Sequence, residues 1–167
     1  MPLNTLMAIR DDSTSRRSTP LNSYAVPQVK ILESILPDNP LLVYQFAKFW
    51  CQSDPQAKTM ALEKTLSLLK DSELGEQEKL KIRSSVYVER GETELAIETM
   101  AAILRGNPLE EEVRFQRAHL LFQAGRLQEA LEEAQNLVRS NRMHRGYNQL
   151  LKHIESEIQK LENPQSQ

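Results

Sequence analysis

The sequence has little cysteine and glycine, no strong excess of either charge and no long apolar run. Cys51 is the only cysteine in 167 residues, so the chain can form neither an internal disulfide nor a multi-cysteine metal site. We interpret it as a buried inert thiol, with a reactive cysteine as the alternative. The net charge of -2 gives no electrostatic footprint for nucleic acid or an anionic membrane, so no nucleic-acid partner is expected.

Targeting signals are also absent from the sequence pattern. No stretch approaches the ~20 apolar residues that a membrane span requires. The N-terminus lacks the basic start and apolar core of a secretory signal. Arg10, Arg16 and Arg17 among Ser and Thr faintly resemble a transit peptide, but Asp11 and Asp12 argue against one. A cytoplasmic location is therefore expected.

A period of 34 residues is the strongest pattern present. Gly91 recurs as Gly125, and Ala96 recurs as Ala130, within similar flanking sequences. Each unit predicts a helix, a glycine turn and a second helix, and each pair leaves an apolar face that only a stacked neighbour can bury. With only five glycines in the chain, helix is expected to dominate.

The apolar spacing and the capping residues place the helices. A short helix from Pro27, with Val29, Leu32, Ile35 and Leu36 on one face, ends at Pro37. The final helix carries an apolar stripe and a polar side suited to capping the stack, although dimerisation through a coiled-coil seam is an alternative. Three helix pairs are predicted, followed by a last helix at 145–162. The two helices of each pair span 40–52 and 55–70, 76–90 and 92–105, and 108–124 and 126–140.

One tripeptide marks two expected helix starts. Asn39-Pro40-Leu41 returns 68 residues later, two periods on, as Asn107-Pro108-Leu109. Asparagine is a good N-cap, and proline is favoured at the first helical position. We therefore expect a helix to begin after each asparagine, with Glu110 completing a capping pair with Asn107.

These residues match a known repeat. The chain resembles the tetratricopeptide repeat family, which implies an all-α, right-handed superhelical stack of antiparallel helix pairs, with about three repeats plus a C-terminal capping helix. We expect a repeat domain over 27–162 between disordered tails at 1–26 and 163–167, since 1–26 is rich in Ser, Thr, Asn and Arg and has no helical period. The matching positions are Ser84, Tyr87, Gly91, Ala96 and Pro108 in the second unit, and Ala118, Gly125, Ala130 and Ala134 in the third.

Three arginines depart from the family pattern. Arg83 and Arg117 stand where the family usually has a buried leucine, and Arg142 replaces the closing proline. Each guanidinium is expected to reach a nearby glutamate, while a functional arginine pair on the groove is the alternative.

Catalytic and metal-binding patterns are lacking. The histidines His119, His144 and His153 do not have metal-ligand spacing, and no phosphate loop or nucleophile elbow is present. We expect no enzyme activity, metal or cofactor.

The resemblance implies recognition on the concave face formed by the first helix of each pair. The expected partner is a helix or extended peptide of another protein. Some members of the family bind the acidic C-terminus of heat-shock chaperones through asparagines at set groove positions. This chain lacks those asparagines, so that ligand class is disfavoured. The groove positions implied by the resemblance are Tyr44, Lys48, Lys81, Ser85, Val88, Glu112, Phe115, His119, Phe122 and Gln123.

Three functions remain open. We favour a non-catalytic scaffold or adaptor, possibly one subunit of a larger complex. The second function is that of a cytoplasmic chaperone for an exported or assembling client. Such a protein would be similar to the three-repeat chaperones of type III secretion. RNA binding by pentatricopeptide-like pairs is the third, opposed by the acidic balance. Phe46, Phe49 and Trp50 are expected to pack against the helix from Pro27, or else to form an exposed hot spot.

Overall fold

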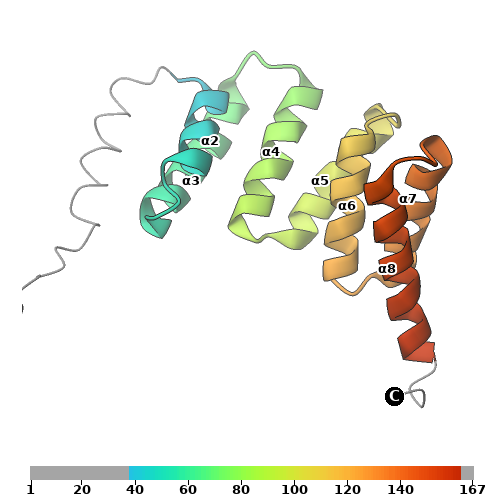
Figure 1. The fold of residues 1–167 in the computed structure, drawn as a ribbon. Helices are drawn as coiled ribbons and strands as arrows, with labels where there is room; N and C mark the ends of the chain where they lie inside the picture. Colours follow the sequence, from blue (N-terminus) through green and yellow to red (C-terminus); the bar gives the residue numbers. More distant parts are fainter. Residues whose placement is uncertain (1–37, 163–167) are drawn as a thin grey trace, which may run out of the picture.

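The computed structural model describes residues 38–162, and this range is entirely helices and connections, with no strand (Figure 1). The expectations for 1–26, for the short helix from Pro27 and for 163–167 lie outside the described residues. Consecutive helices pair up, and the last helix packs on the pair before it, which confirms the predicted all-α stack. The helices are α2 (Pro40–Phe49), α3 (Pro55–Asp71), α4 (Glu76–Arg90), α5 (Thr93–Gly106), α6 (Glu111–Gln123), α7 (Leu127–Ser140) and α8 (Arg145–Glu162).

The glycine turns repeat in geometry as well as in sequence. Gly91 and Gly125 have φ of 72° and 75°, in the left-handed region that ends many helices. The N–H of Glu92 donates to the carbonyl of Tyr87 at 2.9 Å, and the N–H of Arg126 donates to that of Leu121 at 2.9 Å. The 34-residue period therefore fixes the same sharp reversal twice.

The two Asn-Pro-Leu segments behave differently. Asn39 caps α2 as predicted, because its side-chain oxygen accepts from the N–H groups of Leu41 and Leu42 at 3.0 and 3.2 Å. The second prediction was wrong, since α6 begins at Glu111 and Asn107 instead ends α5, its N–H donating to Ile103. Its amide still donates to Glu110 at 3.0 Å, so the predicted side-chain pair holds a turn.

The core lies between successive helix pairs. One cluster joins α2, α3 and α4, and a second joins α6, α7 and α8 with Ile97 of α5. Small residues allow the helices to approach closely, as Ala96, Ala118, Ala130 and Ala134 have no exposed surface. Each helix thus buries its apolar face against its immediate neighbours, as the repeat predicted.

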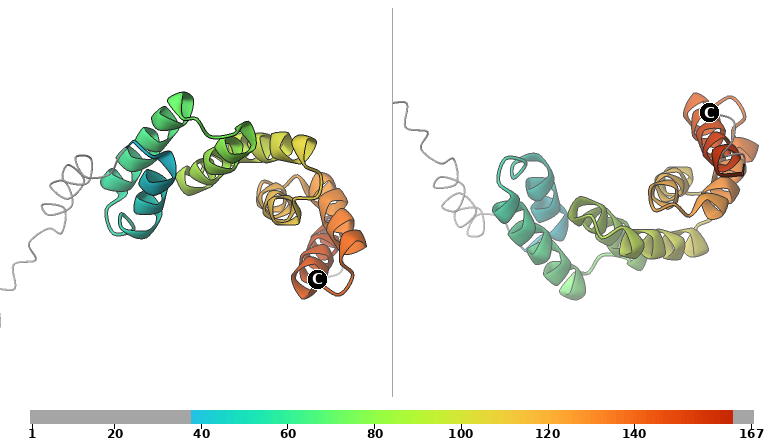
Figure 2. Two further views of the ribbon diagram at one scale, coloured as in Figure 1. Left: turned by 90° about the horizontal axis from the view of Figure 1, so that it is seen from above. Right: turned by 90° about the horizontal axis from the view of Figure 1, so that it is seen from below.

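The helix pairs follow a curve (Figure 2). α6 and α8 lie on its inner side, while α5 and α7 lie on its outer side. The backbones of α2 and α4 come within 8 Å of each other, and so do those of α6 and α8, but those of α4 and α6 do not. The inner row of helices is therefore interrupted between the second and third units, where α5 makes the connection to α6.

Replacing the turn glycine should destabilise the repeat through its backbone alone. An added methyl group at Gly125 meets nothing within 4 Å, but the residue's φ is +75°. We expect Gly125→Ala to lower the free energy of unfolding by about 1 to 2 kcal/mol, measured by urea denaturation. Gly125→Asn is the control and should lose less, because asparagine tolerates this conformation. Equal losses in both variants would contradict a conformational cause.

Candidate functional site

The residues predicted to line a groove lie on α2, α4 and α6 but differ in accessibility. Lys48, Val88, Glu112, His119 and Gln123 are exposed. Of the others, Tyr44 is buried in the N-terminal core cluster, whereas Phe115 and Phe122 pack partly buried against the C-terminal one. The surface open to a partner is therefore narrower than the ten predicted residues.

Lys81 and Ser85 on α4 already have partners within the chain. The Lys81 ammonium donates to Glu110 Oε1 at 2.7 Å, and the Ser85 hydroxyl donates to the Lys81 carbonyl at 3.0 Å. The hydrogen bond from Lys81 holds the pKa of Glu110 below its usual value. This ion pair joins α4 to the turn before α6, so Lys81 connects two units as well as facing solvent.

An aromatic row connects α6 to α8. The ring of Phe115 meets His119 edge-on at 4.7 Å between centroids and lies 5.3 Å from Tyr147. Further along, Phe122 meets His153 at 4.9 Å. Such edge contacts add to the apolar burial that joins the two helices.

Sequence reasoning missed the part that α8 plays in this row. The ring of His144 stacks on Tyr147 at 3.7 Å, and the Tyr147 hydroxyl donates to Glu111 Oε2 at 3.2 Å. Burial, followed by that carboxylate, raises the pKa of Tyr147. Tyr147 belonged to the predicted apolar stripe of the last helix, but a stripe alone does not reveal which helix it contacts. All three histidines of the sequence therefore lie along α6 and α8.

His119 is exposed over much of its side chain, yet its ring rests against Phe115. This partial burial, followed by repulsion from His153, lowers the pKa of His119. The folded chain therefore favours the neutral ring more than the unfolded chain does.

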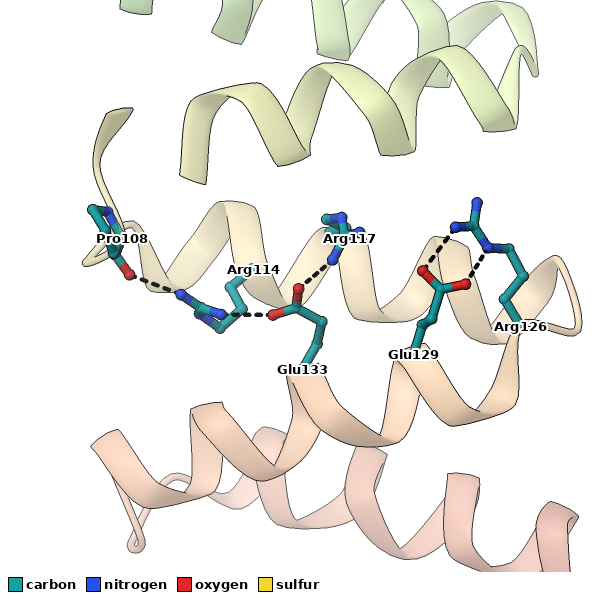
Figure 3. Close-up of polar contacts among 6 residues, drawn as sticks. All are labelled: Pro108, Arg114, Arg117, Arg126, Glu129 and Glu133. Carbon is teal, nitrogen blue, oxygen red and sulfur yellow. Dashed lines mark hydrogen bonds and ion pairs between the residues drawn. The ribbon is translucent and has the colours of Figure 1, made fainter. Parts of the chain in front are cut away.

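Arg117 of α6 lies in an ion cluster with Glu133 of α7, the second helix of the same pair (Figure 3). Glu133 of α7 accepts from Arg117 through one oxygen and from Arg114, at 2.7 Å, through the other. Arg114 also donates to the Pro108 carbonyl at 2.9 Å. The Arg117 Nε is buried without a hydrogen-bond partner in the described part of the chain. The expected pairing with a glutamate is thus present for Arg117.

Arg126 makes a more exposed cluster at the neighbouring turn (Figure 3). It donates to both oxygens of Glu129, at 2.7 and 2.8 Å, and to Glu94 of α5 at 2.8 Å. This arginine therefore spans two units, and its hydrogen bonds lower the pKa of Glu129.

Other chemistry has little support in residues 38–162. Cys51 is buried as predicted, and burial followed by the charge of Asp54 raises the pKa of its thiol, which disfavours the reactive thiolate. That range holds no group of three His, Cys, Asp or Glu side chains placed to bind a metal ion. It likewise includes no helix with the length and apolar character to traverse a bilayer.

Removing the charge of Glu133 should cost more than removing that of Glu129. We expect Glu133→Gln to lower the free energy of unfolding by about 2 kcal/mol, because two largely buried guanidinium groups lose their shared carboxylate. Glu129→Gln, in the exposed cluster, is the matched control and should change stability little. Chemical denaturation measures both, and equal effects would show that burial does not set the strength of the Arg117 cluster.

Acid should weaken the fold in part through His119. Because its pKa is lowered from 6.5 in the folded chain, the unfolded chain binds the proton more tightly, so unfolding becomes easier as pH falls through 6.5 toward the folded value. His119→Gln should flatten this part of the stability profile. NMR titration should also show His153→Gln raising the pKa of His119 only partway to normal, because burial is the larger cause. A complete return to the ordinary value would contradict that order of causes.

Comparison with known proteins concerns the fold. No family model matches the chain, and no curated protein matches its sequence. MamA from AMB-1 is similar in structure with a TM-score of 0.61 and 16% identity, covering 85% of this chain and 84% of that one. MamA from MSR-1 has a TM-score of 0.60 and 15% identity, and the match covers 85% of this chain and 82% of that one.

A tetratricopeptide repeat protein from Parabacteroides merdae is also similar. Its TM-score is 0.54 with 18% identity, and the match covers 87% of this chain and 62% of that protein. These neighbours agree with the repeated glycine turns and the stacked helix pairs described above. The chain therefore has a tetratricopeptide-like fold of stacked helix pairs.

Proposed function

We propose that the chain is a non-catalytic scaffold or adaptor that binds a helix or extended peptide of a partner protein on its inner face. The observation that carries the proposal is the separation of α4 from α6, which interrupts the inner row of helices. Tetratricopeptide-like folds of this kind support protein interaction in general.

The exposed side chains on α4 and α6 suit a peptide. On α4, Val88 is 42% exposed and offers an apolar contact. On α6, His119 and Gln123 are exposed and offer hydrogen-bonding groups, and Glu112 adds a carboxylate. Apolar anchors beside adaptable polar groups are typical of peptide-binding surfaces.

A charge on the inner face should abolish capture of the partner. We expect Val88→Asp to weaken retention by about tenfold or more, because a carboxylate would be desolvated in the interface. Affinity purification from the native cell with mass spectrometry identifies the partner, and titration of the purified pair measures the loss. Leu95→Asp is the matched control, since Leu95 of the outer helix α5 is 45% exposed and should leave binding unchanged.

Two results would decide against the proposal in different ways. Unchanged binding by folded Val88→Asp would place the partner on another surface. A client that is soluble only when co-expressed with this chain would favour the chaperone function over a scaffold, because a scaffold's partner is stable alone.

A further inference from the structure

The helix at the N-terminal end of the described stack is apolar on both sides. One side of α2 belongs to the core, through Val43, Tyr44 and Ala47. Apart from the exposed Gln45 and Lys48, the residues of α2 are apolar, and a helix that is apolar on more than one side is normally covered there. Its outward-facing residues are nevertheless exposed: Leu41 by 47%, Leu42 by 44%, Phe49 by 62% and the adjoining Trp50 by 80%.

The other end of the stack is built differently. The outward side of α8 carries exposed Lys152, Glu155 and Gln159, which suit contact with water. Terminal helices of repeat stacks need such a polar face. The contrast indicates that α8 is a true end of the stack, whereas α2 is an interior helix that lacks its neighbour within the described residues.

The sequence before α2 resembles that of α5 in the spacing of its apolar residues, although Gln28 stands opposite Ala96. The correspondence at 68 residues includes the Asn-Pro-Leu tripeptides and extends backward from them without a gap. Four apolar residues of the segment pair with four of α5 that are buried, with exposures of 2%, 1%, 0% and 8%. These pairs are Val29 with Ile97, Leu32 with Met100, Ile35 with Ile103, and Leu36 with Leu104.

The connection is short, although α2 begins directly after Asn39 whereas α6 begins four residues after Asn107. Leu36 precedes Asn39 by as many residues as Leu104 precedes Asn107. In the described structure this connection places α5 directly against α6. Short connections keep consecutive helices adjacent, so residues 27–37 can reach little beyond α2 and α3.

Phe49 is more exposed than the equivalent residues of the next two units, of which Arg117 contacts α7 of its own unit. The counterparts of Phe49 one and two periods later are Arg83 and Arg117, neither of which is fully exposed, and the Arg117 side chain is only 14% exposed. Phe49, the most apolar of the three, is the one left in water. An aromatic side chain at this position is expected to be covered.

We infer that residues 27–37 form the second helix of a preceding unit and cover the outward side of α2. This segment takes the place that α5 holds against α6, with Val29, Leu32, Ile35 and Leu36 facing Leu42 and Phe49. Its covalent attachment three residues before α2 gives it a high effective concentration, which favours it over a separate protein. The α2 end is then closed within the chain, and the inner face stays free for a partner.

Hydrogen exchange in the full chain tests the inference directly. We expect the amides of residues 29–36 to exchange more than about tenfold more slowly than an unstructured chain, because a docked helix opens only through local unfolding. The double variant Leu32→Asp with Ile35→Asp should remove this protection and speed exchange in α2. Lys30→Asp is the matched control, because its counterpart Glu98 is exposed on α5, and it should leave both segments protected.

Trp50 supplies a second readout, since it is the only tryptophan and borders the outward face. Its emission should move to longer wavelength in the double variant and not in the control. Exchange of residues 29–36 at the unstructured rate in the unmodified chain would overturn the inference. So would protection that disappears on dilution together with a dimer, because the segment would then cover a second copy.

Discussion

Burial of each helix pair against the next is the interaction on which the rest of this structure depends. Single side chains such as Leu121, Leu137 and Ile154, all without exposed surface, each contribute about 1.5 to 3 kcal/mol when removed from water. A lone pair of helices leaves one apolar side in solvent and cannot offset the entropy of ordering its chain. Each added pair therefore contributes to the stability of the stack. At its two ends the outward side of the last helix has to be polar or covered, because no further pair buries it.

Polar contacts at the junctions set how the units are oriented. Lys58 pairs with Glu89 across α3 and α4, Lys81 with Glu110 beyond α4, and Arg126 with Glu94 across the next junction. Most of these side chains are partly in water, where ion pairs add little net stability. Their role is better described as selecting one arrangement of neighbouring pairs, while the apolar contacts supply the energy.

The same packing creates the candidate binding surface. Helices α6 and α8 lie on the inner side of the curve (Figure 2), and α7 shares a core with both of them. Where α5 makes the connection between the second and third units, the backbones of α4 and α6 do not come within 8 Å of each other. On the third unit, the contacts of Phe115 and Phe122 with α8 leave His119 as the exposed member of the row.

Local geometry explains why much of the fold could be predicted from the sequence. The period of the glycines requires the same left-handed turn at Gly91 and Gly125, and the spacing of apolar residues fixes which side of each helix is buried. The Asn-Pro-Leu tripeptide does not by itself decide capping, because Asn39 begins a helix while Asn107 ends one. The candidate groove was the least predictable part.

Sequence by itself determined the repeat, the helices and their buried sides, since these follow from backbone conformations and spacings within one unit. Tertiary structure alone decided that Tyr44 is buried, that Arg117 turns to Glu133, and that α8 contacts Phe115 through Tyr147. These outcomes depend on distances between side chains from different helices. A linear pattern carries no such distances, because they are set only when neighbouring pairs pack together.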